Sequence, residues 1–108
     1  MEQFYIGQTL GLEIKLWNPQ TLLAKDATTI SFSTYHKIAG VWTVIEEDLV
    51  HNVHDTTGTY KRFFYLDPET YTDEEVIRIM CKWTLERETG AYLSDLEIYD
   101  FLLKKSGA

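Results

Sequence analysis

Two histidines and an aspartate, His51, His54 and Asp55, are the residues whose types and spacing most readily suggest chemistry. Imidazole nitrogens and carboxylate oxygens bind zinc, and a spacing of three residues places two histidines on one face of a helix. On a strand the same spacing sends His51 and His54 to opposite faces, and no third ligand follows at a matching distance. We therefore expect exposed histidines beside a turn and no metal site.

A second candidate is a segment rich in carboxylates that precedes an apolar run. Hard cations such as calcium prefer several oxygen ligands, but the spacing differs from that of the EF-hand loop, which needs a glycine at its sharp turn. A solvated acidic loop is the favoured interpretation, with calcium binding and docking against a basic partner as the alternatives. The residues concerned are Asp67, Glu69, Asp73, Glu74 and Glu75.

A catalytic pair of carboxylates is not indicated. Glu46, Glu47 and Asp48 are consecutive, whereas the paired carboxylates of glycosidases face one another across a cleft. We interpret these three residues as a solvated bend. The sequence also lacks a Ser-His-Asp arrangement, a phosphate-binding loop and a dinucleotide fingerprint. We predict that the protein is not an enzyme and uses no cofactor.

Aromatic residues suggest an interaction surface instead. Trp17 and Tyr35 alternate with the aliphatic residues of their expected strands, and Trp42 joins them if Ala39-Gly40 forms a hairpin turn. With Lys15 they would form an exposed patch suited to protein docking or to stacking on sugars. The alternative is that Trp17 or Trp42 is the core tryptophan of the fold.

Short strands are expected along most of the chain, because apolar and polar residues alternate with the period of two that half-buried strands show. Turn-forming residues, including Asn18-Pro19, separate these segments. The expected strands are residues 10–17, 28–37, 41–45, a short one around 49–53, and 60–66.

The last third of the chain fits two periods. In residues 76–85, helical spacing competes with an apolar stripe at every second position, and the stripe favours a strand. In residues 94–105, Ser94 and Glu97 are spaced like a helix cap, yet the apolar residues also alternate. We favour strands in both segments and leave a short C-terminal helix open. The stripe consists of Ile77, Ile79, Cys81, Trp83 and Leu85.

The motif Thr-Gly-x-Tyr occurs twice, in residues 57–60 and 89–92. Gly58 and Gly90 suit backbone conformations that other residues resist, so each marks a chain reversal. Tyr60 and Tyr92 would then begin strands. We predict that both motifs are structural turns.

Composition indicates one globular domain, residues 1–108. Aromatic residues make up 14% of the chain, and the net charge of −7 argues against nucleic-acid binding, which requires clustered lysine and arginine. The single cysteine, Cys81, lies in an apolar run and is expected to be buried. No secretory signal or membrane-spanning run is recognisable, so we expect folding in a reducing cytoplasm and no membrane partner.

Three stretches, "YIGQTLGLEIKLWNP", "DATTISFSTYHKIAGVW" and "TTGTYKRFFYL", resemble small immunoglobulin-like modules of tailed bacteriophages and related bacterial proteins. The resemblance implies an all-β, immunoglobulin-like sandwich of about seven antiparallel strands. It also suggests that Tyr60 acts as a tyrosine corner, tying down the loop behind it through its hydroxyl. Antibody-type domains carry a cysteine two residues after that tyrosine, where this chain has Arg62, so the intersheet disulfide is absent.

The resemblance further implies a non-enzymatic structural protein of a phage particle, such as a neck, head–tail connector, tail or capsid-associated component. Such a part would fold in the host cytoplasm and dock, in several copies, on itself or on other virion proteins. The alternative is a carbohydrate- or cell-surface-binding module that uses the aromatic patch. Modules of that kind usually accompany another domain, and we expect none here.

Overall fold

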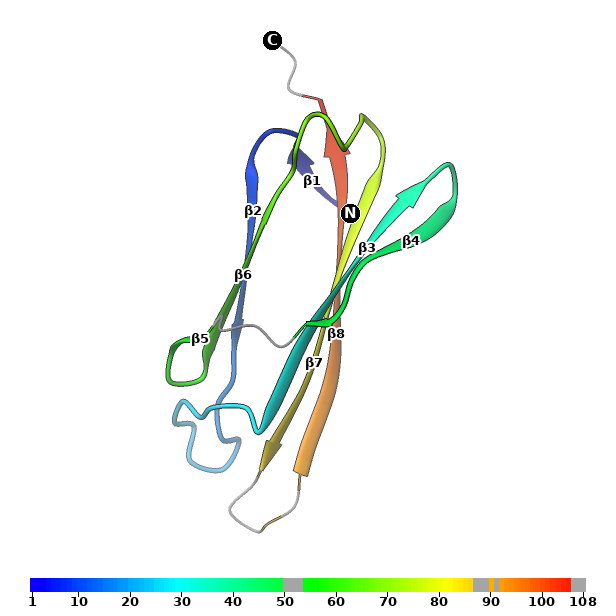
Figure 1. Cartoon of the computed structure of the whole chain (residues 1–108). Helices are drawn as coiled ribbons and strands as arrows, with labels where there is room; N and C mark the ends of the chain where they lie inside the picture. Colours follow the sequence, from blue (N-terminus) through cyan, green and yellow to red (C-terminus); the bar gives the residue numbers. More distant parts are fainter. Residues whose placement is uncertain (50–53, 87–89, 91, 106–108) are drawn as a thin grey trace.

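A computed structural model of the chain describes residues 1–49, 54–86, 90 and 92–105. These residues form eight strands and no helix, in a sandwich measuring 52 × 26 × 23 Å (Figure 1). The strands are β1 (Glu2–Tyr5), β2 (Thr9–Lys15), β3 (Thr29–Ile38), β4 (Val41–Leu49), β5 (His54–Thr56), β6 (Thr59–Tyr65), β7 (Val76–Glu86) and β8 (Tyr92–Lys104).

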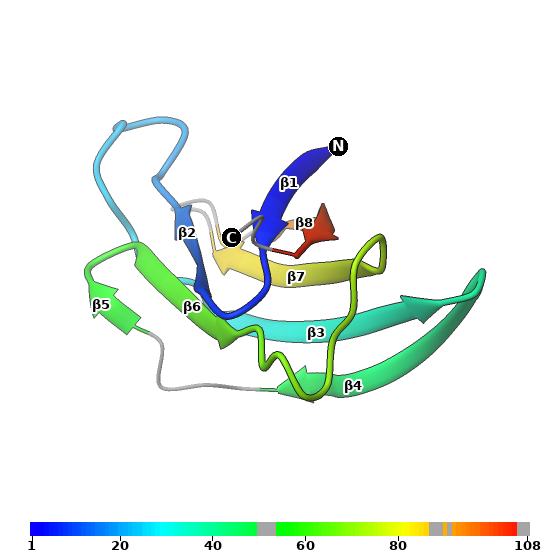
Figure 2. The ribbon, with the colours of Figure 1, turned by 90° about the horizontal axis from the view of Figure 1, so that it is seen from above.

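The strands form two sheets that face one another (Figures 1 and 2). The large sheet has the order β1-β8-β7-β3-β4, and the small sheet has the order β2-β6-β5. All pairings are antiparallel except that of β1 with β8, which is parallel. The chain therefore crosses between the sheets several times, as Greek-key sandwiches do.

The core lies between the sheets and is built from every second residue of the strands. In β2 the aliphatic residues are buried while Glu13 and Lys15 are exposed, and β7 buries one side in the same way. β6 contributes the rings of Tyr60 and Phe64 from the small sheet. The deepest members, at most 1% exposed, include Leu10, Phe32, Leu66, Ile77, Ile79, Cys81, Leu85 and Leu103.

The sequence predictions of an all-β chain and of strands in both ambiguous segments are confirmed. The possible C-terminal helix is wrong, because residues 92–104 form one strand that pairs with β7 along residues 92–102. Pairing with β7 accompanies the burial of Phe101 and Leu103, whereas a lone helix of this length is marginally stable in water. The expected short strand around 49–53 falls mainly outside the described residues.

Two further predictions need correction. Glu46, Glu47 and Asp48 do not form a bend but continue β4, which carries register shifts opposite Thr34. The strand count was also too low, since residues 2–5 form β1, which pairs in parallel with β8. Only Phe4 and Ile6 alternate there, a pattern too short to predict a strand, and the pairing depends on the distant ring of Phe101 at 6.2 Å from that of Phe4.

Gly58 and Tyr60 together anchor the long connection between β2 and β3. Gly58 has a φ of +74° and donates its N–H to Asp26 Oδ1 at 2.7 Å. Its carbonyl accepts the N–H of Leu16 at 2.7 Å. The Tyr60 hydroxyl accepts the N–H of Ala27 at 2.9 Å, so it holds a loop far upstream in sequence.

Candidate interaction surfaces

The outer face of the large sheet, the side away from the core, carries a group of apolar side chains, several of them exposed. We define the outer face by the residues of β3, β4, β7 and β8 whose side chains point away from the small sheet. Directly paired positions such as Tyr35 with Val44 and Met80 with Ile98 lie side by side on it. Its described apolar members are Tyr35, Trp42, Val44, Met80, Leu96 and Ile98.

An ion pair fixes the middle of the outer face. Arg78 donates from Nε and one terminal nitrogen to the two carboxylate oxygens of Asp100, at 2.7 and 2.9 Å. The hydrogen bonds from Arg78 are the main reason why the pKa of Asp100 lies below its usual value. The guanidinium also lies 4.5 Å from the ring centre of Trp42, and Lys37 Nζ lies 5.4 Å from the same centre. The ring of Trp42 therefore packs against two cationic side chains.

A separate groove lies between the sheets, beside β8 and the end of β2. It has a volume of about 250 Å³. On the β7–β8 side, Trp83 Nε1 and the Tyr99 hydroxyl each donate to one oxygen of Glu97 at 3.0 Å. Burial, followed by this hydrogen bond, raises the pKa of Tyr99 to about 12. The groove is lined by Lys15, Leu16, Trp17, Pro19, Trp83, Leu93 and Glu97.

Two buried ion contacts cross the interior near the connection between β6 and β7. Arg62 of the small sheet reaches Glu46 of the large sheet at 2.6 Å. His36 Nε2 approaches Glu75 Oε2 to 2.5 Å, without the angles of a hydrogen bond. The Tyr71 ring packs edge-on against His36, with 4.8 Å between ring centres. Arg62, His36 and Glu75 are largely enclosed, whereas the side chain of Glu46 is 29% exposed.

Glu75 predicts one pH effect on stability. Burial alone would raise the pKa of its carboxyl, but hydrogen bonds from Thr72 and the charge of His36 outweigh burial and lower it below the ordinary 4.5. The ionised form is thus favoured by folding, so its contribution to stability is full above the unfolded pKa and is lost as the pH falls through the folded one. We expect the urea midpoint of Glu75→Gln to fall less steeply than that of the wild type below about pH 4.5. Glu69→Gln, at an exposed position, should keep the wild-type slope; equal slopes for all three proteins would contradict the assignment.

The predicted aromatic patch is divided between two places. Tyr35 and Trp42 lie together on the outer face of the large sheet, whereas Trp17 and Lys15 belong to the small-sheet side of the groove. Trp17 is 55% exposed and Trp42 is 37% exposed, so neither is the core tryptophan. Trp83 comes closest to that role, because it is half-buried and packs against the core.

The two Thr-Gly-x-Tyr turns differ in surroundings. Gly58 is buried in close contact with Leu16 and Lys25, and Tyr60 packs into the core. Gly90 also has a positive φ, of +81°, but has open space around it. Tyr92 begins β8 as predicted, and of its side chain the structure describes nothing.

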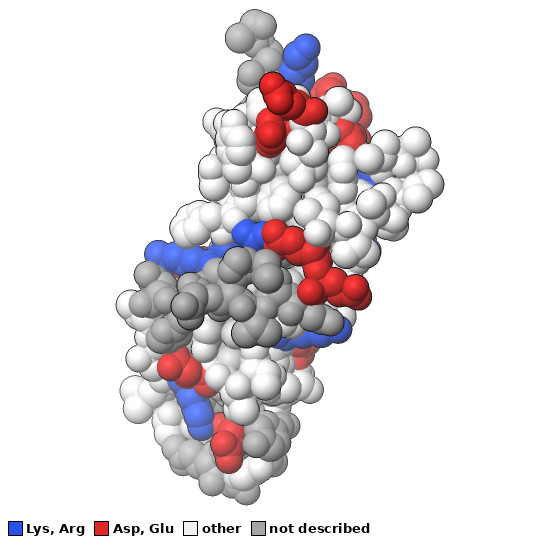
Figure 3. All heavy atoms as spheres, in the orientation of Figure 1, with Lys and Arg blue, Asp and Glu red and all other residues white. Residues whose placement is uncertain are grey.

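The acidic loop uses its carboxylates within the protein. Asp67 Oδ1 accepts the N–H of Glu69 at 3.0 Å, Asp73 Oδ1 accepts the N–H of Lys105 at 2.8 Å, and Glu74 pairs with Lys104. Acidic side chains consequently gather at the end of the molecule where this loop lies (Figure 3). Among the described residues no group of three His, Cys, Asp or Glu could hold a metal ion. His51 lies outside those residues, and only the backbone of His54 and Asp55 is described.

Sequence reasoning missed the partners that complete each surface. Arg78 and Asp100 are directly paired across β7 and β8, and Glu97 meets Trp83 one strand away. The alternation of residues along β7 and β8 shows which face of the sheet each side chain occupies. It does not show which residues are directly opposite, because the register between two strands also depends on the loop that joins them.

The described part of the chain contains no helix long and apolar enough to cross a membrane. In comparisons with known proteins, no family model, no curated protein and no solved structure matches this chain. The sandwich and its two surfaces are therefore the basis on which a function is inferred.

Proposed function

We propose that this protein is a non-enzymatic, immunoglobulin-like docking protein that serves as a structural component of a tailed-phage particle. In this role it folds in the host cytoplasm, assembles in several copies and contacts other virion proteins. The observation that carries the docking role is the outer face of the large sheet, where Trp42, Val44 and Ile98 remain exposed. The assignment to a phage particle is supported by the resemblance of residues 5–65 to phage modules.

The order of the strands supports the immunoglobulin-like assignment. If β2 to β8 are named B, C, C′, D, E, F and G in chain order, the large sheet reads G-F-C-C′ and the small sheet reads B-E-D. Variable-type immunoglobulin domains place strands in this order. Under this assignment Tyr60 begins strand E, whereas the tyrosine corner precedes strand F. Tyr60 therefore shares the hydrogen-bonding role of that motif but not its position.

The outer face suits protein docking better than sugar binding. Interface cores are enriched in tryptophan, tyrosine, methionine and arginine, and the outer face combines Trp42, Tyr35, Met80 and Arg78. A sugar-binding tryptophan instead needs a ring face free for stacking. Arg78 and Lys37 already lie over the ring of Trp42, and a sugar would have to displace them. The carbohydrate-binding alternative is thus less well supported by this surface.

Self-assembly through the outer face is tested by light scattering over a wide range of concentration. We expect the wild-type mass to rise toward a defined oligomer, and Val44→Lys to remain monomeric because the new charge would be desolvated at the contact. Phe63→Lys is the matched control, since Phe63 is 61% exposed on the small sheet. Unchanged circular dichroism would show that each variant is folded.

A wild type that stays monomeric at every concentration would contradict the self-assembly part of the proposal. Wild-type association by Val44→Lys would show that the outer face is not the contact. Binding to immobilised glycans that Trp42→Ala abolishes would favour the sugar-binding alternative.

A further inference from the structure

β8 has a long free edge. On one side it pairs with β7 along residues 92–102, and on the other it pairs with β1 only at residues 101–104. Within the described residues no strand covers the second side along residues 92–100. The other edge of the large sheet, β4, carries register shifts of the kind that discourage strand pairing. The edge of β8 therefore offers the more regular template for an added strand.

The backbone groups on this edge belong to the even-numbered residues. Leu103 directs its N–H toward Glu75 on the β7 side, whereas the carbonyl of Lys104 accepts the N–H of Ile6 on the β1 side. Leu96 follows the same alternation as Lys104. Its N–H points away from β7 and donates to Asp95 Oδ1 at 2.8 Å. The free edge thus presents the N–H and carbonyl groups of Ser94 and Ile98 and the carbonyl of Leu96.

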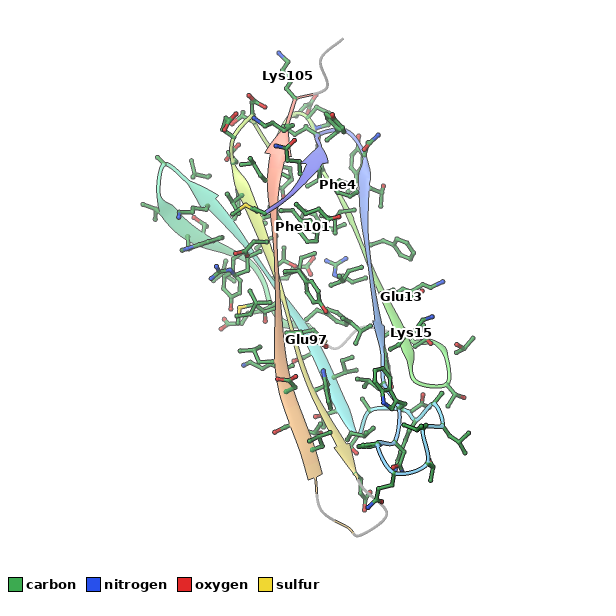
Figure 4. All side chains as sticks on the ribbon, turned by 180° about the vertical axis from the view of Figure 1, so that it is seen from behind. Phe4, Glu13, Lys15, Glu97, Phe101 and Lys105 are labelled. Atoms are coloured by element: carbon green, nitrogen blue, oxygen red, sulfur yellow. The ribbon has the colours of Figure 1, made fainter. Side chains whose placement is uncertain are left out.

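The groove between the sheets opens beside the same edge. Glu97 on β8 and Lys15 on β2 come from opposite sheets, and β1, with Phe4 beside Phe101, covers only the far end of β8 (Figure 4). Trp17 and Trp83 supply apolar walls. A strand added to β8 would therefore find hydrogen-bonding groups along its length and a lined space for the side chains that it points inward.

The edge is acidic on its inner side. Asp95 and Glu97 are consecutive inward positions of β8, paired across the ladder with Trp83 and Cys81. Glu97 is bonded by the neutral donors of Trp83 and Tyr99, and among the described residues no lysine or arginine pairs with it. An incoming strand that carries positive charge at its inward positions would complement both carboxylates.

A second copy of this edge does not provide that charge. Antiparallel pairing of residues 92–100 with themselves about Leu96 would set Asp95 directly opposite Glu97, twice. Like charges directly opposite each other destabilise a strand pair. The net charge of −7 adds to the repulsion between copies.

We propose that the free edge of β8 and the adjoining groove bind an extended segment of another protein in which arginine alternates with β-branched residues. The arginines point inward, where their guanidinium groups pair with Asp95 and Glu97 and stack on the tryptophans of the groove. The β-branched residues point outward and cover Leu96 and Ile98, which are 43% and 50% exposed. This surface shares Leu96 and Ile98 with the outer face but leaves Trp42 and Val44 uncovered, because they lie on β4 at the opposite edge of the large sheet.

The test uses the full chain and the synthetic peptide TRVRVRVT, with TEVEVEVT as the charge-reversed peptide. We expect fluorescence anisotropy to show that only the arginine peptide binds and that added salt weakens this binding. In NMR spectra, the amide signals of Ser94, Leu96 and Ile98 should shift when the peptide is added. Asp95→Asn combined with Glu97→Gln should weaken binding at least about tenfold. Glu47→Gln combined with Glu69→Gln makes the same change in net charge at exposed sites elsewhere and should leave binding nearly unchanged.

Ile98→Pro removes an edge N–H without removing a β7 ladder bond, and should also reduce binding if the variant folds. Val44→Lys should bind the peptide normally, so failure of the outer-face contact and failure of this site are distinguishable. The proposal is overturned by absence of binding, by equal loss of affinity in both double variants, or by shifts outside β8 and the groove. A wild-type dimer that protects the β8 amides would overturn it in favour of a second copy.

Discussion

Replacing Gly58 with alanine is expected to destabilise the fold by about 2–4 kcal/mol. A Cβ built on Gly58 would lie 2.4 Å from the carbonyl oxygen of Leu16 and 2.9 Å from the backbone nitrogen of Lys25. Backbone atoms cannot rotate away as a flexible side chain can, so the β5–β6 turn or the β2–β3 connection must shift. The left-handed φ of +74° adds a second penalty, because alanine reaches that region at a cost of about 1–2 kcal/mol.

Gly40→Ala separates these two causes. Gly40 has a similar φ of +81°, but a Cβ there would meet nothing within 4 Å. It should therefore show the conformational penalty alone, about 1 kcal/mol. Urea unfolding followed by tryptophan fluorescence would measure both variants. Equal losses of stability would mean that the close approach at Gly58 contributes nothing.

The turn at Gly58 also shows how far sequence reasoning reached. The glycine and the strand after it were predictable from turn chemistry and alternation, because both are local. The reason why only glycine fits was not, since Leu16 and Lys25 approach it from a loop more than thirty residues upstream. The same holds for Tyr60. Its inward position follows from the alternation of residues in the strand, but its hydrogen-bond partner, Ala27, could not be predicted from that pattern.

Long-range register limited the prediction of the surfaces in the same way. Trp17 alternates with buried residues, so a period of two marks it as exposed, whereas the neighbours of Trp42 in β4 are themselves exposed. Placing them in one patch required knowing which strands are neighbours, and β2 and β4 belong to different sheets. The grouping of Trp42 with Arg78 depends on the pairing of β3 with both β4 and β7, which no local signal specifies.

Removing the carboxylate of Glu46 is expected to be the other severe substitution. Arg62 points from β6 into the core with its side chain only 8% exposed, and Glu46 Oε2 lies 2.6 Å from its guanidinium. Arg62 also donates to the carbonyl of Phe63 and lies 5.5 Å from the ring centre of Phe64, but its Nε finds no hydrogen-bond partner among the described residues. Without Glu46 the buried guanidinium would lose the carboxylate that pairs with it, so Glu46→Ala should cost about 2–4 kcal/mol.

The double variant distinguishes the two possible roles of this pair. If Glu46 serves mainly to neutralise Arg62, Arg62→Met combined with Glu46→Leu should recover most of the stability that Glu46→Ala loses, because no buried charge remains. If the ion pair is itself the attraction that joins the sheets, the double variant should stay as unstable as the single one. We expect recovery, since Glu46 is 29% exposed and water weakens its attraction for Arg62. Glu13→Ala, which breaks the exposed contacts with Lys15 at 3.3 Å and Lys61 at 3.9 Å, should change stability by less than about 0.5 kcal/mol and sets the baseline for solvent-exposed ion pairs.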